Sequence, residues 1–268
     1  MSQTDDLPQA AGQKYTAPAL EKGLDIIELL STEGGGLMQT DIARRLNRSV
    51  SEIFRMLVVL QARGYVQLDP DSDRYVLTTR LFEVAHRTPM VKRLTTAAAP
   101  VMQRLVRGAN QSCHLAMISG DSVIVIGQVD SPGNNIMSVR LGATIDLWRA
   151  SSGRVILAHV APEVLDEALA HRSADDPRSE AQVRAELAAI RATGHEVMDS
   201  FVARGIVNIS APVFDHSGGP VAALTIPYLQ RYQETLPFDD CKAMLLDAAA
   251  QISRNLGGGA RSVQDQRF

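Results

Sequence analysis

Arginine side chains are concentrated in one short segment, and arginine is the residue whose geometry best matches a phosphate group. Residues 40–63 carry five arginines against two acidic residues, a local net charge of +3, although the whole chain has a net charge of −3. Binding to nucleic acid depends on where the cations lie more than on their total. The segment is therefore a candidate for contact with DNA, and its arginines are Arg44, Arg45, Arg48, Arg55 and Arg63.

The pair Ser151–Ser152 is a second place where residue types suggest chemistry, because a helix is expected to begin there. Unpaired backbone N–H groups and serine hydroxyls converge at a helix start. The helix dipole favours a carboxylate there by roughly 0.3–1 kcal/mol when the site is exposed. The pair, with Gly153, is a candidate anion site, and the alternative is that the serines only cap the helix.

Enzyme chemistry finds little support in the sequence. The six histidines are scattered, without the His-x-His or Glu-x-x-His spacing of a metal site. Asp199-Ser200 lacks the G-x-S-x-G frame of an activated serine, and the segment 151–153 lacks the frame of a phosphate loop. Cys113 and Cys241 lie far apart with no second cysteine near either, which excludes a zinc ribbon and suits a reducing compartment. We expect no catalytic residue, no metal and no cofactor.

Composition places the chain among ordinary globular proteins, with 45% hydrophobic and 21% charged residues. Its longest apolar run, residues 56–60, is far shorter than the roughly 20 residues of a membrane helix. The N-terminal segment holds no apolar core of a secretory signal. We therefore expect a cytoplasmic protein that does not bind membranes.

Three helices and a hairpin are expected in residues 15–78, and they position the arginine-rich segment. The first helix follows leucines and isoleucines at helical spacing up to a run of three glycines, and the second spans about 39–46. The third begins at Ser49, where Ser49 and Glu52 have capping-box spacing, and it ends at Gly64. The residues expected on its buried face are Val50, Ile53, Phe54, Leu57 and Leu60.

Only Asn47 and Arg48 separate the second helix from the third, so the two must cross steeply, as in a helix-turn-helix. Two short β-favouring runs at 65–68 and 74–77 then flank a turn rich in aspartate, which predicts a hairpin. Three helices followed by a hairpin make a winged helix-turn-helix.

Such a domain places its third helix in the major groove of DNA, with the first residues of that helix at the base edges. Arg55 shares the outward face with Ser51 and could bond guanine through two nitrogens, while Glu52 could accept from cytosine or orient Arg55. Arg74 in the hairpin is the expected wing contact with phosphate. The alternative is a winged helix that binds another protein. The candidate DNA-binding residues are Arg44, Arg48, Ser49, Ser51, Glu52, Arg55 and Arg74.

The second half of the chain mixes strands with helices. A connecting helix is expected over 79–107, with interruptions near Pro89 and Pro100. The pattern predicts an α+β domain in which helices cover a sheet. Its expected strands are 114–118, 123–129, 206–214 and 220–226 with a further candidate at 137–141, and its expected helices are 151–161, 161–170, 179–194 and 238–256. The predicted divisions are a mobile tail at 1–14, the winged helix-turn-helix at 15–78, a linker helix at 79–93, the sheet domain at 94–257 and a tail at 258–268.

Six segments of the chain can be compared with known families: ALEKGLDIIELL at 19–30, DIARRL at 41–46, FRML at 54–57 with GYV at 64–66, SSGRVILA at 151–158, GIVNISAPV at 205–213 and GPVAALT at 219–225. Together they resemble the IclR-type bacterial transcription regulators. The resemblance covers about residues 15–257 and implies a winged helix-turn-helix joined by a linker helix to a GAF-like effector-binding domain. It also implies a dimer or tetramer that controls catabolic genes, with small carboxylates or aromatic acids as effectors.

The resemblance further implies which residues line the effector pocket. Relatives that bind small acids use an acidic residue, a cysteine and strand hydroxyls. In this chain Met198 takes the acidic position, Asn208 replaces the cysteine, Thr225 keeps one hydroxyl and Pro227 loses another, so we expect a larger or less polar acid, with Trp148 adding apolar surface. In the alternative interpretation, Asn208 and Thr225 bond to each other across adjacent strands. The candidate effector-binding residues are Leu147, Ser151, Ser152, Gly153, Met198, Asp199, Asn208 and Thr225.

The sequence as a whole predicts a ligand-responsive DNA-binding regulator that represses a catabolic operon and is not an enzyme. Its expected partners are double-stranded operator DNA, a small organic or aromatic acid bound as a carboxylate, and further copies of the chain in a homodimer or homotetramer. Two alternatives stay open: an enzyme that acts on a small acid through the second domain, and a winged-helix scaffold for protein interactions.

Overall fold

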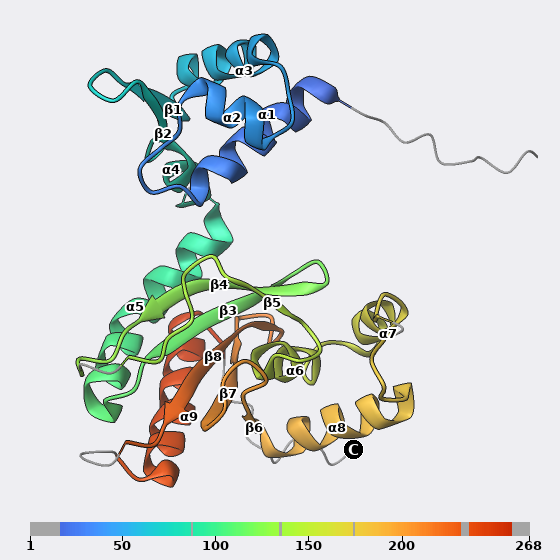
Figure 1. The fold of residues 1–268 in the computed structure, drawn as a ribbon. Coiled ribbons are helices and arrows are strands. Elements are labelled where there is room, and N and C mark those ends of the chain that lie inside the picture. Colours follow the sequence, from blue (N-terminus) through green and yellow to red (C-terminus); the bar gives the residue numbers. More distant parts are fainter. Residues whose placement is uncertain (1–16, 87, 134–135, 174, 232–235, 259–268) are drawn as a thin grey trace, which may run out of the picture. The chain divides into compact units, whose positions relative to one another are not determined.

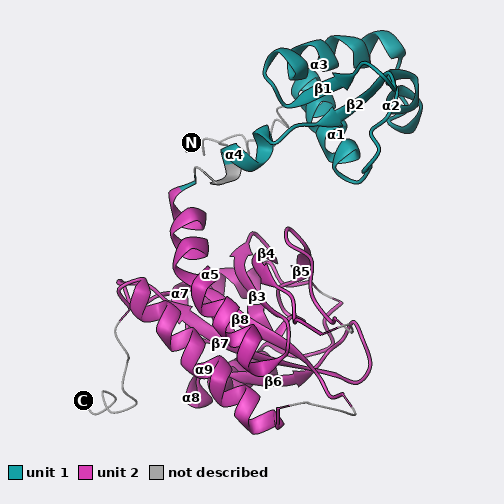
Figure 2. Ribbon diagram, turned by 90° about the vertical axis from the view of Figure 1, so that its left-hand side faces the viewer, with its two compact units in different colours: residues 1–88 teal, residues 89–268 magenta. Residues whose placement is uncertain are grey.

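The computed structural model describes residues 17–86, 88–133, 136–173, 175–231 and 236–258. Figure 1 shows its helices and strands, and Figure 2 shows that the chain divides into two compact units. Residues 1–88 form the first unit and residues 89–268 the second, and each unit has its own hydrophobic core. The predicted fold class, a winged helix-turn-helix followed by an α+β sheet domain, is confirmed.

The first unit is a cluster of three helices followed by a two-stranded hairpin. Ser49 caps α3 in a complete capping box with Glu52, as the sequence predicts. The hairpin strands pair antiparallel, and Leu37 forms a bridge with Tyr75 that joins the hairpin to the helices. The elements of this unit are α1 (Pro18–Ser31), α2 (Gln39–Arg45), α3 (Val50–Ala62), β1 (Val66–Asp69), β2 (Arg74–Leu77) and α4 (Arg80–His86).

The buried face of α3 is narrower than predicted. Ile53 and Leu57 are fully buried, whereas Val50 is 46% exposed and Phe54 is 51% exposed. With 3.6 residues per turn, Val50 and Phe54 lie at one edge of the stripe that Ile53 and Leu57 define. The prediction that all five apolar positions are buried is therefore wrong at these two.

The second unit is built on a six-stranded antiparallel sheet with the strand order β5-β4-β3-β8-β7-β6. The candidate strand at 137–141 is a loop, and the short edge strands β5 and β6 take positions that the sequence does not predict. The elements are α5 (Pro89–Ala109), β3 (Cys113–Ser119), β4 (Ser122–Val129), β5 (Thr144–Asp146), α6 (Ser151–Leu157), α7 (Pro162–Ala170), α8 (Glu180–Thr193), β6 (Glu196–Asp199), β7 (Ile206–Phe214), β8 (Pro220–Leu229) and α9 (Phe238–Asn255).

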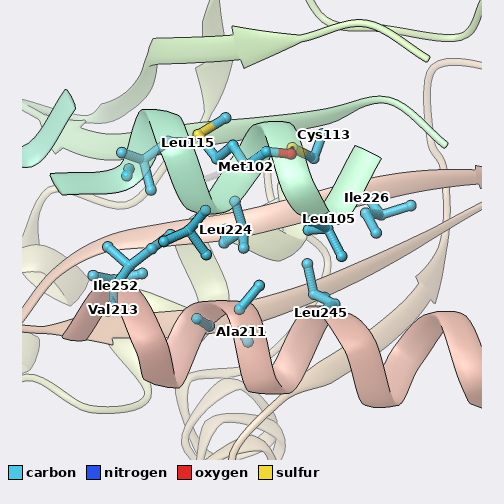
Figure 3. Packing of buried hydrophobic residues seen from close by; sticks show 14 of the residues in the cluster. Met102, Leu105, Cys113, Leu115, Ala211, Val213, Leu224, Ile226, Leu245 and Ile252 are labelled. Carbon is cyan, nitrogen blue, oxygen red and sulfur yellow. The ribbon is translucent and has the colours of Figure 1, made fainter. Parts of the chain in front are cut away.

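Different helices cover the two faces of this sheet. Helices α5 and α9 pack on one face, against buried strand residues that include Leu115, Ala211 and Leu224 (Figure 3). Helix α6 packs on the opposite face against β3, β7 and β8, where Ala116 and Ala223 are buried. Because side chains alternate along a strand, every second residue of the central strands points toward α6.

The connecting helix is interrupted near Pro89, as the sequence predicts. Helix α4 ends at His86, and α5 begins at Pro89 after a bend at Thr88. Within α5 the helix runs unbroken through Pro100, although the sequence predicts an interruption there. Proline removes one helical hydrogen bond, but the buried contacts of the α5 residues on either side keep the helix in place.

Candidate functional site

The start of α3 carries polar residues that the sequence singled out, and the protein itself holds Glu52 there. The carboxylate of Glu52 accepts hydrogen bonds from Lys22 Nζ at 2.6 Å, from Ser49 Oγ at 2.7 Å and from the Ser49 backbone N–H at 3.1 Å. These bonds, that from Lys22 first, lower the pKa of Glu52 to about 2. Glu52 therefore fixes α1 against the start of α3, and within the described residues it forms no bond with Arg55.

Arg55 lies on the exposed side of α3, one turn after Ser51. Its guanidinium forms no hydrogen bond or ion pair with any residue that the structure describes, and the same holds for Arg48 in the link before α3. The Oγ atom of Ser51 lies 3.3 Å from that of Ser49, and Val58, 47% exposed, follows one turn after Arg55. Ser51, Arg55 and Val58, called the outward face of α3 below, offer a hydroxyl, an unpaired cation and an apolar side chain.

Two further arginines that the sequence singled out bond inside the protein. Arg74 donates from Nη1 to the carbonyl oxygen of Gly36 at 3.0 Å, which ties the hairpin to the turn before α2. Arg44 pairs with Asp41 at 2.7 Å, but its side chain is 76% exposed. An exposed ion pair of this kind contributes little free energy, so Arg44 can exchange Asp41 for another anion.

A pocket of about 440 Å³ opens on the α6 face of the sheet in the second unit. The strands contribute His114, Asn208, Thr225 and Pro227, which are called the floor below. Residues 150–152 at the start of α6 form one wall. The segments 137–140, 143–146 and 200–202, called the rim below, complete the lining. A pocket of this volume fits a small organic molecule.

Polar side chains line up across the three central strands beneath this pocket. Ser210 of β7 lies opposite Thr225 of β8, which lies opposite His114 of β3, and the three residues are 0%, 1% and 4% exposed. The Oγ atom of Ser210 is 2.7 Å from Thr225 Oγ1 and 2.7 Å from Ser151 Oγ of α6. The hydroxyls therefore form a continuous hydrogen-bonded chain, and Ser151, Ser210, Thr225 and His114 are called the polar row below.

His114 ends the polar row with an uncharged imidazole. Burial lowers the pKa of His114 to about 4, so the ring is neutral at neutral pH. Its Nδ1 atom has no hydrogen-bond partner in the described part of the chain. A neutral imidazole offers one donor and one acceptor, so the floor presents neutral polar groups to whatever enters the pocket.

The rim supplies the charged groups of the pocket. Asp146 is occupied, because its Oδ1 accepts the backbone N–H groups of Trp148 and Arg149 at 2.9 Å each. The Arg149 guanidinium lies next to the rim, 4.4 Å from the ring centroid of Phe201. Arg140 is exposed, and no described residue bonds to its guanidinium. Arg140 is therefore the group in the described lining that is ready to pair with an anion.

The structure brings only some of the candidate effector residues together at the pocket. Ser151, Ser152, Asn208 and Thr225 line it. Met198 and Asp199 lie instead on the edge strand β6, and Leu147 is buried beneath α6. A side chain at Gly153 would place its Cβ 2.2 Å from the carbonyl oxygen of Leu147, so Gly153 permits a close packing contact rather than lining the pocket.

The alternative bond between Asn208 and Thr225 is not formed. Thr225 bonds Ser210, while Asn208 lies opposite Pro227, and its amide has no hydrogen-bond partner among the described side chains. His114, Ser210 and Arg140 are pocket or row residues that the sequence analysis did not select. Polar residues inside largely apolar strands are the feature that could have indicated His114 and Ser210.

Arg154 of the SSGR segment fixes α6 from below the pocket. It donates from Nε to Glu196 Oε1 at 2.7 Å and from Nη1 to Glu186 Oε2 at 2.8 Å. Burial raises the pKa of Glu196, and the charge of Arg154 opposes that rise. This pairing anchors α6 to β6 and α8, so Arg154 positions the pocket wall without lining the pocket.

Metal-binding and membrane-spanning features were searched for across the described ranges. No group of three or more His, Cys, Asp or Glu residues there is placed to hold a metal ion. No helix in the same ranges is long and apolar enough to cross a bilayer.

Comparison with known proteins identifies relatives over nearly the whole chain. The family described as bacterial transcriptional regulator IclR C-terminal matches residues 87–254, and the IclR helix-turn-helix domain matches residues 19–70. The HTH-type transcriptional regulator BhcR of Paracoccus denitrificans is 28% identical over 92% of this chain and 88% of its own length. The HTH-type transcriptional repressor AllR of Escherichia coli is 26% identical over 90% of this chain and 91% of its own length. The crystal structure of Thermotoga maritima IclR matches with a TM-score of 0.69 at 28% identity, over 90% of this chain and 99% of that one.

Proposed function

The chain belongs to the IclR family of bacterial transcriptional regulators, not to a family of enzymes, and on this basis we propose that it represses a catabolic operon and leaves the operator when it binds a small organic acid. The first unit binds double-stranded operator DNA, and the second unit binds the acid. The relative AllR, which is named as a repressor, supports the sign of the regulation. The protein acts in the cytoplasm, where its operator lies.

The unpaired Arg55 on the outward face of α3 carries the DNA half of this proposal. Helix α3 enters the major groove with that face toward the bases, where the Arg55 guanidinium bonds guanine and Val58 meets a thymine methyl group. Arg48 and Ser51 bond phosphates or base edges at the same end of the helix. Ser49 and Glu52 shape the start of the helix. Arg44, which is exposed, and Arg74, which also bonds to Gly36, contact the DNA backbone.

Fluorescence anisotropy tests this assignment with a DNA duplex that the wild-type protein has selected from a random pool. Arg55→Ala should weaken binding by about 10- to 100-fold, the loss of one bidentate base contact. Arg191→Ala is the matched control, because Arg191 is an exposed arginine of α8 without a bond to any described residue. Unchanged affinity in Arg55→Ala would contradict the assignment, and failure to select any duplex would favour a protein-binding winged helix.

The free guanidinium of Arg140 carries the effector half of the proposal. The carboxylate of the acid pairs with Arg140 at the rim, a charge-assisted bond that no described protein group already occupies. The body of the acid lies against apolar lining residues such as Met137, Val139 and Ile145. We therefore infer an aromatic or similarly apolar acid.

Thermal melting of the full chain with benzoate as a probe tests the pocket. At 100 times its dissociation constant, a ligand adds about 2.7 kcal/mol to the stability of the unit that holds it. Fluorescence of Trp148, the only tryptophan of the chain and a buried residue of the second unit, reports that melting directly. Arg140→Ala should abolish the shift and Arg191→Ala should keep it, and an equal shift in all three proteins would place benzoate elsewhere.

Release from the operator requires that the acid bind the DNA-free arrangement more tightly than the DNA-bound one. We propose that a homodimer or homotetramer presents two winged helices to half-sites about 34 Å apart. Repeating the anisotropy titration with saturating acid measures the coupling. An operator affinity that does not change with the acid would contradict repression relieved by this pocket.

A further inference from the structure

Helix α5 concentrates positive charge on one surface of the second unit. Its 21 residues include four cations and no acidic residue, a net charge of +4, although the whole chain has a net charge of −3. The four cations, all exposed, are Lys92, Arg93, Arg104 and Arg107. Apolar residues of the helix such as Leu94 are buried against the sheet, so the charge is confined to the solvent side.

Three of these cations form a strip without partners. At about 100° per residue, Lys92, Arg104 and Arg107 fall within about 120° of one another around the helix axis. No hydrogen bond or ion pair joins any of the three to a residue that the structure describes. Arg93 differs, because it donates from Nη2 to the carbonyl oxygen of Leu256 at 2.8 Å. Lys92, Arg104 and Arg107 are called the cationic strip below.

Other cations of the second unit are paired with acidic residues. Arg154, Arg178 and Arg184 each form ion pairs within the described ranges. Helices commonly support a base with an acid three or four residues away, whereas α5 contains no acid. An open groove of about 700 Å³ runs beside the strip, and its lining includes Lys92 of α5 and Asn255 of α9. The strip is therefore free to meet an external anion.

We propose that the cationic strip of α5 binds phosphates of the DNA that flanks the operator. The second unit then adds to DNA affinity without reading sequence, because contacts with phosphate position a protein and carry no base information. This goes beyond the proposed function, in which the first unit alone contacts DNA. The strip rises about 22 Å from Lys92 to Arg107, and a duplex carries one phosphate for about every 1.7 Å of its axis. Phosphates therefore meet the strip in any register.

Charge and chain connection favour DNA over other occupants. Two copies of the strip that faced each other would place like charges in opposition, which disfavours an interface between copies of this helix face. An acidic protein would match the charge as well as DNA does. Helix α5, however, begins at Pro89, the first residue after the boundary of the proposed DNA-binding unit. DNA held by that unit is thus tethered to the strip and has a high effective concentration there.

Fluorescence anisotropy with the full chain tests the proposal on two duplexes, the operator alone and the same operator extended by about two helical turns of unrelated sequence on each side. The variant Arg104→Gln, Arg107→Gln removes two cations and keeps long polar side chains. On the extended duplex, its slope of log affinity against log salt should be about 1.8 shallower than that of the wild type, since each phosphate contact contributes about 0.9. Between about 50 and 200 mM salt the wild type should therefore lose about 12-fold more affinity than the variant. On the operator alone the two proteins should bind equally.

The matched control is Arg191→Gln, Arg204→Gln, which makes the same change of net charge at two exposed arginines of the second unit without a bond to any described residue. It should bind both duplexes as the wild type does, and so should Arg104→Lys, Arg107→Lys, which keeps the charge of the strip. Equal melting followed by Trp148 fluorescence checks that each variant is folded.

Several outcomes would overturn the role of the strip. One is an unchanged salt slope in Arg104→Gln, Arg107→Gln, and another is an equal fall of the slope in the control. Binding of polyglutamate that this variant loses, with an unchanged slope on DNA, would assign the strip to an acidic protein instead. If the wild type selects no operator, the proposed function fails. The strip reads no sequence, so a random duplex of the extended length should then still show the same difference in slope.

Discussion

Replacing Ser210 with alanine removes the hydroxyl at the centre of the polar row. The hydroxyls of Ser151 and Thr225 each lose a partner at 2.7 Å, and these residues are only 3% and 1% exposed. Leaving a buried polar group unpaired costs about 1–3 kcal/mol, and two groups lose their partner, so Ser210→Ala should lower the free energy of unfolding of the second unit by about 2–6 kcal/mol. The triple variant Ser151→Ala, Ser210→Ala, Thr225→Val removes all three hydroxyls of the polar row, so none of them is left unpaired. It should therefore be more stable than Ser210→Ala.

Thermal unfolding of the full chain, followed by Trp148 fluorescence, measures both effects. Trp148 is 7% exposed and packs in the cluster beneath α6, so it reports the second unit alone. For a unit of this size each kcal/mol shifts Tm by about 2–4 °C. Ser119→Ala is the matched control, since Ser119 is an exposed serine at the end of β3. A Ser210→Ala protein that melts with the wild type, or a triple variant less stable than the single one, would refute the reasoning.

Three further predictions concern His114, Gln128 and Ser49. The pKa of His114 falls from 6.5 to about 4 on folding, so the unfolded chain takes up the proton first as the pH falls. The free energy of unfolding is therefore highest above pH 6.5 and falls by about 3 kcal/mol between pH 6.5 and 4. Urea titrations should show a flatter pH profile for His114→Leu than for the wild type. Gln128 accepts a hydrogen bond from the Leu141 N–H at 2.9 Å and donates one to Ser138 Oγ at 3.3 Å. Gln128→Ala should therefore loosen the loop that carries Arg140 and weaken benzoate binding by about 3- to 10-fold. Equal affinity in calorimetry would show that the loop keeps its shape without these bonds. Ser49→Ala removes the cap of α3 and should destabilise that helix by about 0.5–2 kcal/mol. Hydrogen exchange in α3 should become faster, while the affinity for benzoate stays unchanged. Equal exchange in the variant and the wild type would contradict the role of the cap.

The winged helix-turn-helix was predictable because its determinants are local. The capping box at Ser49 and Glu52 and the short link before it each act within one turn of backbone. The structure contains the capping box, and only Asn47 and Arg48 lie between the cap residues Leu46 and Ser49. Phe54 was misplaced because periodicity gives the angle of a side chain around the helix but not the width of the surface that covers it. In the structure the neighbours of α3 bury Ile53 and Leu57 and leave Phe54 half exposed.

The pocket was less predictable because it depends on register between distant strands. Cys113, His114, Leu115 and Ala116 are all buried, so β3 lacks the alternation that would show which residues face a ligand. The partnership of Ser210 with Thr225 follows only from the pairing of β7 with β8. Arg140 lies in a loop whose path is set by the short strand β5 and by the bonds of Gln128, and neither leaves a periodic pattern in the sequence.

The position of His114 in β3 connects the floor of the pocket to the packing of α5 on the other face of the sheet. Cys113 and Leu115, its neighbours in the strand, are buried on the opposite face among side chains of α5 such as Met102 and Leu105 (Figure 3). Because packed interiors deform little, any shift of β3 at His114 would also shift the surface on which α5 rests. Helix α5 begins at Pro89, the first residue after the boundary between the two units. The same strand thus presents His114 to the pocket on one face and, on the other, packs against the helix that begins at the boundary between the two units.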